Sequence, residues 1–131
     1  MERVTVNPWS WSVGFGFNQG EVVSGRGRLV FCAGQAATDA EGRPVYEGDM
    51  AGQLERSVAN LEAVLGAAGM GLPNLVRLTV YATDVDLLLE HYGVLAGRLG
   101  AAGVASVMTV LGVPRLVFPS LLVELEGTAV G

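Results

Sequence analysis

Cysteine, histidine and lysine are almost absent from this chain of 131 residues. It contains one cysteine, one histidine and eight basic residues, all of which are arginine. A single cysteine excludes an internal disulfide bond and is typical of a reducing compartment. Because Cys32 lies in the apolar segment LVFCAG, we interpret it as a small buried hydrophobic residue and not as a nucleophile. One histidine is too few for a histidine-based metal site, so we expect no bound metal.

Charge is also scarce, and it is mainly negative. Only 16% of the residues are charged, and the formal net charge is −5. Nucleic-acid binding needs a basic stripe that neutralises phosphates, whereas the arginines here are scattered along the chain. An acidic membrane surface is an unfavourable partner for the same reason. We therefore expect neither nucleic acid nor a membrane as a partner.

Long hydrophobic runs are missing as well. No apolar run reaches the roughly 18 residues that a membrane-spanning helix needs. The N-terminal segment MERVTVNPW is charged and lacks the apolar core of a signal peptide, so we expect a cytoplasmic protein. Half of the residues are nevertheless hydrophobic, which predicts one globular domain over residues 1–131.

Two segments have the periodicity of amphipathic helices. In the first, apolar residues recur at helical spacing over residues 50–68, and Asp49 precedes them as an N-cap. The second follows Asp84 or Asp86, either of which is a suitable cap, and extends to about Leu99. Both segments are long enough to cover a sheet.

The remaining apolar segments are typical of strands. The expected strands are residues 22–23, 28–33, 74–84, 105–111 and 121–127. The first two are separated by SGRG, which predicts a hairpin, and residues 1–20 read as an aromatic-rich loop. The order β-β-α-β-α-β-β predicts an α+β fold with a mixed sheet and two helices on one face.

The second face of this predicted sheet needs a cover. Residues 28–33 and 105–111 are apolar on both faces, but two helices can cover only one of them. Large exposed apolar patches are rare on monomers. The pattern therefore predicts an oligomer.

The last predicted strand, within VFPSLLVELEG, carries carboxylates in an apolar run. Strand alternation places Glu124 and Glu126 on the same face as Leu122 and opposite Val123. An exposed sheet face and a pocket both explain this pattern.

Several motifs together resemble one known family. They are GFNQG (16–20), LVFCAGQAATDAEG (29–42), NLEAVLGAAGMGLPNLVRLTVYATDVD (60–86) and LLVELEG (121–127). In this order they resemble the Rid family of reactive-intermediate deaminases, also called the YjgF or L-PSP family. The resemblance extends from about residue 13 to residue 130.

The resemblance implies both an architecture and an activity. It implies a chorismate-mutase-like fold and a homotrimer, assembled as a barrel with clefts between neighbouring subunits. For members that are enzymes, it implies hydrolysis of enamines and imines to a keto acid and ammonia, without a cofactor.

The family's functional residues carry over only in part. Counting back nine residues from Pro114, the position of the family's substrate-carboxylate arginine holds Ala105. Phe17 stands where the family has a tyrosine, and Ala33–Gly34 match its Ser-Gly pair. Glu124 matches the glutamate that positions water, which makes it the catalytic candidate. This chain therefore resembles a divergent member that lacks the carboxylate clamp.

The cleft implied by the resemblance would be largely apolar around Glu124. Without a neighbouring arginine, a carboxylate in such a cleft should have a raised pKa, which suits proton transfer near neutral pH. Arg115 either replaces the missing arginine or is an ordinary surface residue, while Glu126 and His91 are expected to be solvated. The candidate substrate-binding residues are Phe17, Ala33, Gly34, Ala105, Ser106, Val107, Met108 and Arg115.

Three functions follow from these observations. The first is hydrolysis of a neutral or bulky imine or enamine, with weak or no activity on 2-imino acids because Ala105 replaces the arginine. The second is a non-catalytic trimer that binds or senses a small molecule. The third, ribonuclease activity or inhibition of translation, is disfavoured by the acidic charge balance.

Overall fold

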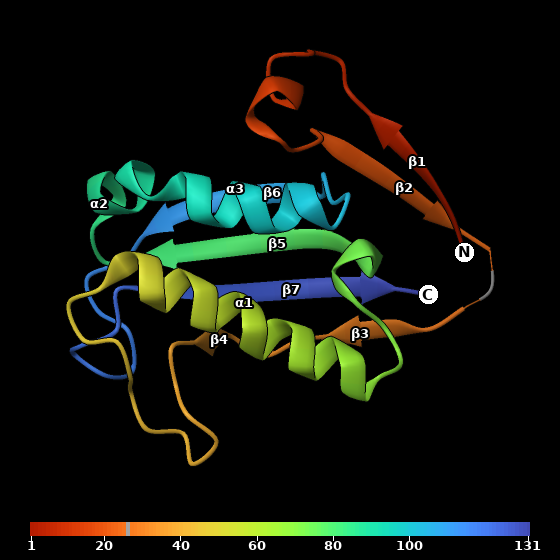
Figure 1. Ribbon diagram of the computed structural model, residues 1–131. Coiled ribbons are helices and arrows are strands. Elements are labelled where there is room, and N and C mark those ends of the chain that lie inside the picture. Colours follow the sequence, from red (N-terminus) through yellow and green to blue (C-terminus); the bar gives the residue numbers. More distant parts are fainter. Residues whose placement is uncertain (26) are drawn as a thin grey trace.

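The computed structural model describes residues 1–25 and 27–131 and has the predicted α+β architecture (Figure 1). Its main sheet has the strand order β3 (Leu29–Phe31), β7 (Val123–Val130), β5 (Leu75–Ala82) and β6 (Val107–Gly112), and β4 (Gln35–Ala36) also pairs with β7. The β5–β6 pair is parallel and the other pairs are antiparallel, so the sheet is mixed.

The helices α1 (Met50–Ala67), α2 (Val85–Glu90) and α3 (Tyr92–Ala101) lie on one face of this sheet (Figure 1). The Asp49 side chain accepts a hydrogen bond from the amide of Gly52, which confirms it as the cap of α1. Asp84, and not Asp86, caps α2 by accepting from the amide of Leu87. The second predicted helix is divided at His91, whose backbone is not helical.

The core lies between these helices and the sheet. Aliphatic side chains from α1, α3, β5 and β7 are almost completely buried there: Leu54, Val58, Leu61, Leu65, Leu78, Val80, Leu95, Leu99, Val123 and Leu125. Alternation therefore directs the odd-numbered residues of β7 toward the helices. Its even-numbered residues, which include Glu124 and Glu126, lie on the face without helices.

The N-terminal part of the chain differs from the prediction. β1 (Glu2–Val6) pairs with β2 (Gly20–Ser24) in a separate two-stranded sheet that stands away from the main sheet (Figure 1). The predicted hairpin of residues 22–23 with 28–33 is wrong, because β3 pairs with the end of β7. Position 26 of the expected turn lies outside the described residues. The pairing partners in β1 and β2 are at least fourteen residues apart in sequence, and those in β3 and β7 are much further apart, so no local turn signal indicated them.

The two last strands are shifted from their predicted positions. β6 begins at Val107, after a segment in which Ala105 and Ser106 are not in a strand, and β7 continues three residues beyond Gly127. On the face without helices, Phe31 is 77% exposed and Leu29 is 54% exposed. In the described part of the chain, no helix is long and apolar enough to cross a membrane.

Candidate functional site

Glu124 lies on the helix-free face of β7, between Ala36 of β4 and Tyr81 of β5. Its carboxyl group lies against the backbone of Gly34. A Cβ atom added to Gly34 would be 2.6 Å from Glu124 Cδ and 2.8 and 2.9 Å from its two carboxyl oxygens. Glycine at position 34 therefore leaves the space that the carboxyl group occupies, and the structure brings these two predicted residues together.

A second carboxylate lies on the same face and affects the first. Glu126 accepts a hydrogen bond from the Tyr81 hydroxyl at 3.3 Å. Burial raises the pKa of the Glu124 carboxyl above its ordinary value, and the negative charge of Glu126 raises it further. The predicted direction of this pKa shift is confirmed, and its physical causes are desolvation and like-charge repulsion.

The segment that carries Ala33 and Gly34 is held by helix α1. Asn60 Nδ2 donates to the carbonyl oxygens of Ala36 and Thr38 at 2.8 and 3.1 Å. Arg56 Nε donates to the same Thr38 carbonyl at 2.9 Å. These polar side chains of α1 therefore position the backbone that touches Glu124.

Arg77 also lies on this face, although neither its sequence context nor the family resemblance indicated it as a site residue. On β5 it is opposite Val107 of β6 and Thr128 of β7. It shares its face with Tyr81, whose pKa is raised by desolvation and by the two glutamates and lowered by Arg77. Strand alternation already separated Arg77 from the core. Only the β5–β7 register shows that it shares a face with Glu124.

The start of β6 is tied to the N-terminal segment. Asn18 donates from its side chain to the carbonyl of Ala105 at 2.6 Å and from its backbone to the carbonyl of Ser106 at 3.3 Å. Ser106 itself is buried, and its hydroxyl has no hydrogen-bond partner among residues 1–25 and 27–131. Val107 lines a cavity of about 460 Å³ together with Phe31 and Arg77.

Glu124 and Ala105 do not meet within one chain. Tyr81 of β5 pairs with Glu124 on one side and with Leu111 of β6 on the other. Arg77 of β5 pairs in the same way with Thr128 and with Val107, the first residue of β6. Four residues of strand separate these two levels, which corresponds to about 13 Å along the sheet. Ala105 lies still further along, before β6 begins.

Phe17 and Met108 lie in a different part of the structure from Glu124. Both line a cavity of about 500 Å³ formed with residues of α2 and α3. Met108 pairs with Leu78, a core residue, so its side chain is on the helix side of β6. The structure therefore brings Phe17 to Met108 and places both across the sheet from Glu124.

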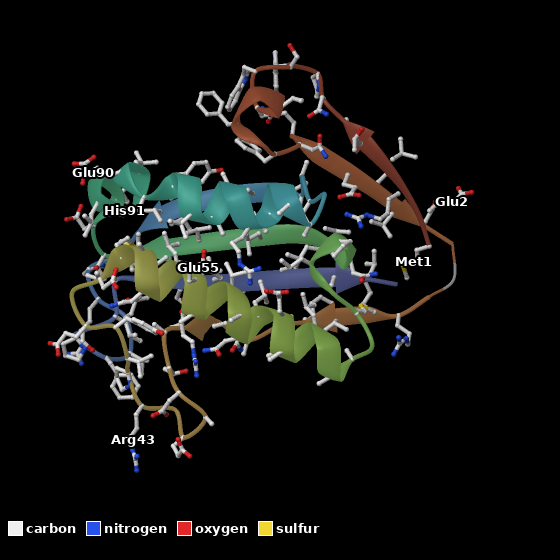
Figure 2. All side chains as sticks on the ribbon, in the orientation of Figure 1. Met1, Glu2, Arg43, Glu55, Glu90 and His91 are labelled. Atoms are coloured by element: carbon white, nitrogen blue, oxygen red, sulfur yellow. The ribbon has the colours of Figure 1, made fainter. Side chains whose placement is uncertain are left out.

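Arg115, His91 and Cys32 have no recorded contact with Glu124 or Glu126 among the described residues. Arg115 is exposed, and its guanidinium donates to the carbonyls of Leu116 and Val117 in its own loop at 3.3 and 3.5 Å. His91 lies at the junction of α2 and α3 (Figure 2). Cys32 is buried, as predicted, and burial raises the pKa of its thiol, which disfavours a nucleophilic thiolate.

The chemistry available to this face is proton transfer. Within residues 1–25 and 27–131, no group of three or more histidine, cysteine, aspartate or glutamate side chains is arranged to hold a metal ion. A partly buried carboxyl group with a raised pKa can donate a proton and, once ionised, can accept one.

Comparison with known proteins gives consistent matches over most of the chain. The family model described as Endoribonuclease L-PSP matches residues 15–131. A RutC family protein of Pyrococcus abyssi is 31% identical over 104 residues, which are 79% of each chain. A Rid-family protein of unknown function from Yersinia pestis superposes with a TM-score of 0.84 at 34% identity, over 98% of both chains. A member of the YjgF/YER057c/UK114 family from Mycobacterium tuberculosis has a TM-score of 0.66 at 28% identity, also over 98% of both chains.

Proposed function

Because this chain belongs to the L-PSP family, also called Rid or YjgF, we propose that it forms a homotrimer whose intersubunit clefts act on a small imine or enamine. Its fold is the chorismate-mutase-like α+β fold of that family. The observation that carries the proposal is the Glu124 carboxyl group, which has a raised pKa and lies against Gly34 on a face without helices.

Exposed apolar side chains support the assembly. Leu29 and Phe31 are exposed on β3, beside the face that carries Glu124. Covering them with a second copy would remove apolar surface from water. In one chain Glu124 and Ala105 lie at different levels of the sheet, so a cleft that combines them needs residues of two copies.

The proposed reaction is hydrolysis of a C=N bond. The protonated carboxyl group of Glu124 donates a proton to the imine nitrogen, which makes the carbon more electrophilic. The resulting carboxylate accepts a proton from water as the water oxygen attacks that carbon. Glu124, protonated again, donates its proton to the amino group of the carbinolamine, the C–N bond breaks to release ammonia, and the carboxylate takes the hydroxyl proton as the C=O bond forms. One water is consumed, one ammonia is released, and no electrons are transferred.

The substrate we propose carries no carboxylate next to the reacting carbon. Ala105 cannot hold such a carboxylate, and Arg115 donates to carbonyls of its own loop. Simple 2-imino acids should therefore be poor substrates. Arg77 is a cation that shares a face with Glu124, on the neighbouring strand.

A non-catalytic trimer that binds a small molecule in the same clefts is the second candidate. This candidate is favoured because Ala105 replaces the arginine that holds the substrate in the family's enzymes. The carboxyl group of Glu124 can still form hydrogen bonds with a ligand without catalysing a reaction. Cleavage of RNA, the activity in the family name Endoribonuclease L-PSP, is disfavoured by the net charge of −5.

The experiment is to measure ammonia release from freshly generated imines, with and without a carboxylate, by the wild type, Glu124→Gln and Ala105→Arg. The molar mass of each sample is measured by light scattering. We expect a trimer, turnover of the neutral imine by the wild type, and its loss in Glu124→Gln. We expect Ala105→Arg to gain activity on 2-imino acids.

The control is Glu90→Gln, which changes an exposed carboxylate at the end of α2 (Figure 2). Equal turnover by the wild type and Glu124→Gln would contradict the catalytic role. Binding of the neutral imine without turnover in any variant would favour the second candidate. A monomeric wild type would contradict the intersubunit cleft.

A further inference from the structure

A second cavity lies on the helix side of the sheet edge, away from Glu124. Its volume is about 500 Å³, and it lies between the N-terminal segment, the α2–α3 region and β6. Seven side chains line it: Trp11, Phe15, Phe17, Leu89, Tyr92, Met108 and Val110. None of the seven carries a charge, and four are aromatic. This volume is within the range of small-molecule sites.

One chain supplies all the residues that line the cavity, and several apolar side chains at its opening are exposed to solvent. Trp11 is 59% exposed, Phe15 is 62% exposed and Leu89 is 57% exposed. Exposed aromatic side chains that surround a hollow are typical of a binding site rather than of scattered surface residues. The rim therefore favours an apolar occupant.

The aromatic wall has a defined shape. The ring of Trp11 lies edge to face with the rings of Phe15 and Phe17, with centroid separations of 6.3 and 5.7 Å. These rings belong to the N-terminal segment, which stands over α3 and β6 (Figure 1). Edge-to-face packing leaves ring faces available for a further flat molecule.

Tyr92 anchors this wall to the body of the protein. Its hydroxyl donates to the Phe15 carbonyl at 3.2 Å and lies 3.5 Å from Met108 Sδ. Burial raises the pKa of Tyr92, so the phenol remains neutral and keeps its proton for this bond. The soft thioether of Met108 lines the same cavity and adapts to aromatic rings.

We infer that this cavity binds a flat, uncharged aromatic molecule. An uncharged lining disfavours an ionic ligand, because a charge placed there would lose its hydration without gaining a partner. The site is independent of the proposed chemistry at Glu124, which lies across the sheet. It is formed by a single chain and needs no second copy.

The test uses N-phenyl-1-naphthylamine, a neutral fluorescent aromatic probe. In Trp9→Phe, Trp11 is the remaining tryptophan of the two in the chain, so energy transfer from it detects probe bound near Trp11, and the variants below test whether that probe lies in this cavity. We expect saturable binding of one probe per chain. Phe15→Ala and Leu89→Arg, both at exposed positions that tolerate substitution, should each weaken binding at least tenfold.

The matched control is Val13→Ala, because Val13 is exposed in the same N-terminal turn but does not line the cavity. It should bind the probe as the wild type does, and so should Glu124→Gln. Unsaturable binding, or equal affinity in Phe15→Ala and Leu89→Arg, would overturn the inference. Binding of the probe only to protein that has been diluted to monomers would also overturn it, because a neighbouring copy would then fill the cavity in the oligomer.

Discussion

The carboxyl group of Glu124 occupies the space that a side chain at residue 34 would need, 2.6 Å from the position of a Cβ atom on Gly34. The two residues come from β7 and from the segment before β4, ninety positions apart in sequence. This contact holds the carboxyl group against the backbone, where burial and Glu126 raise its pKa.

Gly34→Ala should therefore impair the site without unfolding the protein. The new methyl group meets the flexible end of a glutamate side chain, which can rotate away at little cost to stability. We expect at least a tenfold loss of imine turnover or ligand affinity with a thermal midpoint close to that of the wild type. In Gly14→Ala an added Cβ meets nothing within 4 Å, so this variant should match the wild type in both measurements.

The stability of the protein should depend on the protonation of Glu124. Its folded-state pKa is raised, so the folded state binds more protons than the unfolded state between the ordinary value of 4.5 and the raised value. This contribution is fully present below pH 4.5 and is lost as the pH rises through the folded pKa. Glu124→Gln should flatten that part of the pH dependence of the free energy of unfolding, measured by denaturant titration.

The comparison for this measurement is Glu90→Gln, which should keep the wild-type slope. A wild type and Glu124→Gln with parallel stability curves from pH 4 to 8 would show that the environment of Glu124 does not raise its pKa.

Phe31→Arg should disrupt the proposed trimer. Phe31 is 77% exposed in the single chain, and a buried arginine at an apolar subunit contact would lack a partner. We expect light scattering to show monomers at concentrations at which the wild type is trimeric. Leu89→Arg, an equal change of charge on the helix side, should remain trimeric. A trimeric Phe31→Arg would place the subunit contact elsewhere.

Two buried polar residues of α1 should respond in opposite ways to apolar substitution. Gln53 donates to the carbonyls of Tyr46 and Ser120 and accepts from the amide of Leu122 at 2.7 Å. Gln53→Leu leaves these buried groups unpaired and should lower the free energy of unfolding by roughly 2–4 kcal/mol. Ser57 is also fully buried, but its hydroxyl has no partner among the described residues.

Ser57→Ala should consequently leave stability unchanged or raise it slightly. Denaturant unfolding of both variants, beside the wild type, measures the difference. A similar loss in both would mean that cavity formation, and not hydrogen bonding, determines the effect.

Substitutions of two glycines, one inside α3 and one just after it, distinguish the effect of helix propensity on stability from the effect of a left-handed backbone conformation. An added Cβ meets nothing within 4 Å at either Gly97 or Gly103. Gly97 lies inside the helix, so Gly97→Ala should stabilise the protein by about 0.5–1 kcal/mol. Gly103 has a φ of +71°, so Gly103→Ala should destabilise it by about 1–2 kcal/mol. Opposite shifts of the thermal midpoint are expected, and shifts of the same sign would contradict this explanation.

Much of the local structure was predictable from the sequence. Asp49 at the start of α1 and the alternation of β5 depend on neighbouring residues, so capping and periodicity indicate them directly. The carboxylates of β7 were predictable for the same reason. The break at His91 was missed because the apolar periodicity continues through it.

Long-range pairing, by contrast, was decided only by the tertiary structure. The chain does not carry a local signal that β1 pairs with β2, that β3 pairs with β7, or that Arg77 shares a face with Glu124. Strand register depends on the packing of both faces over the whole sheet, which no short segment specifies. The sequence by itself therefore determined which segments are helical, apart from the break at His91, together with the α+β class and the chemical candidate Glu124. Packing determined that Gly34 would touch this carboxylate and that Phe17 would line a separate aromatic cavity.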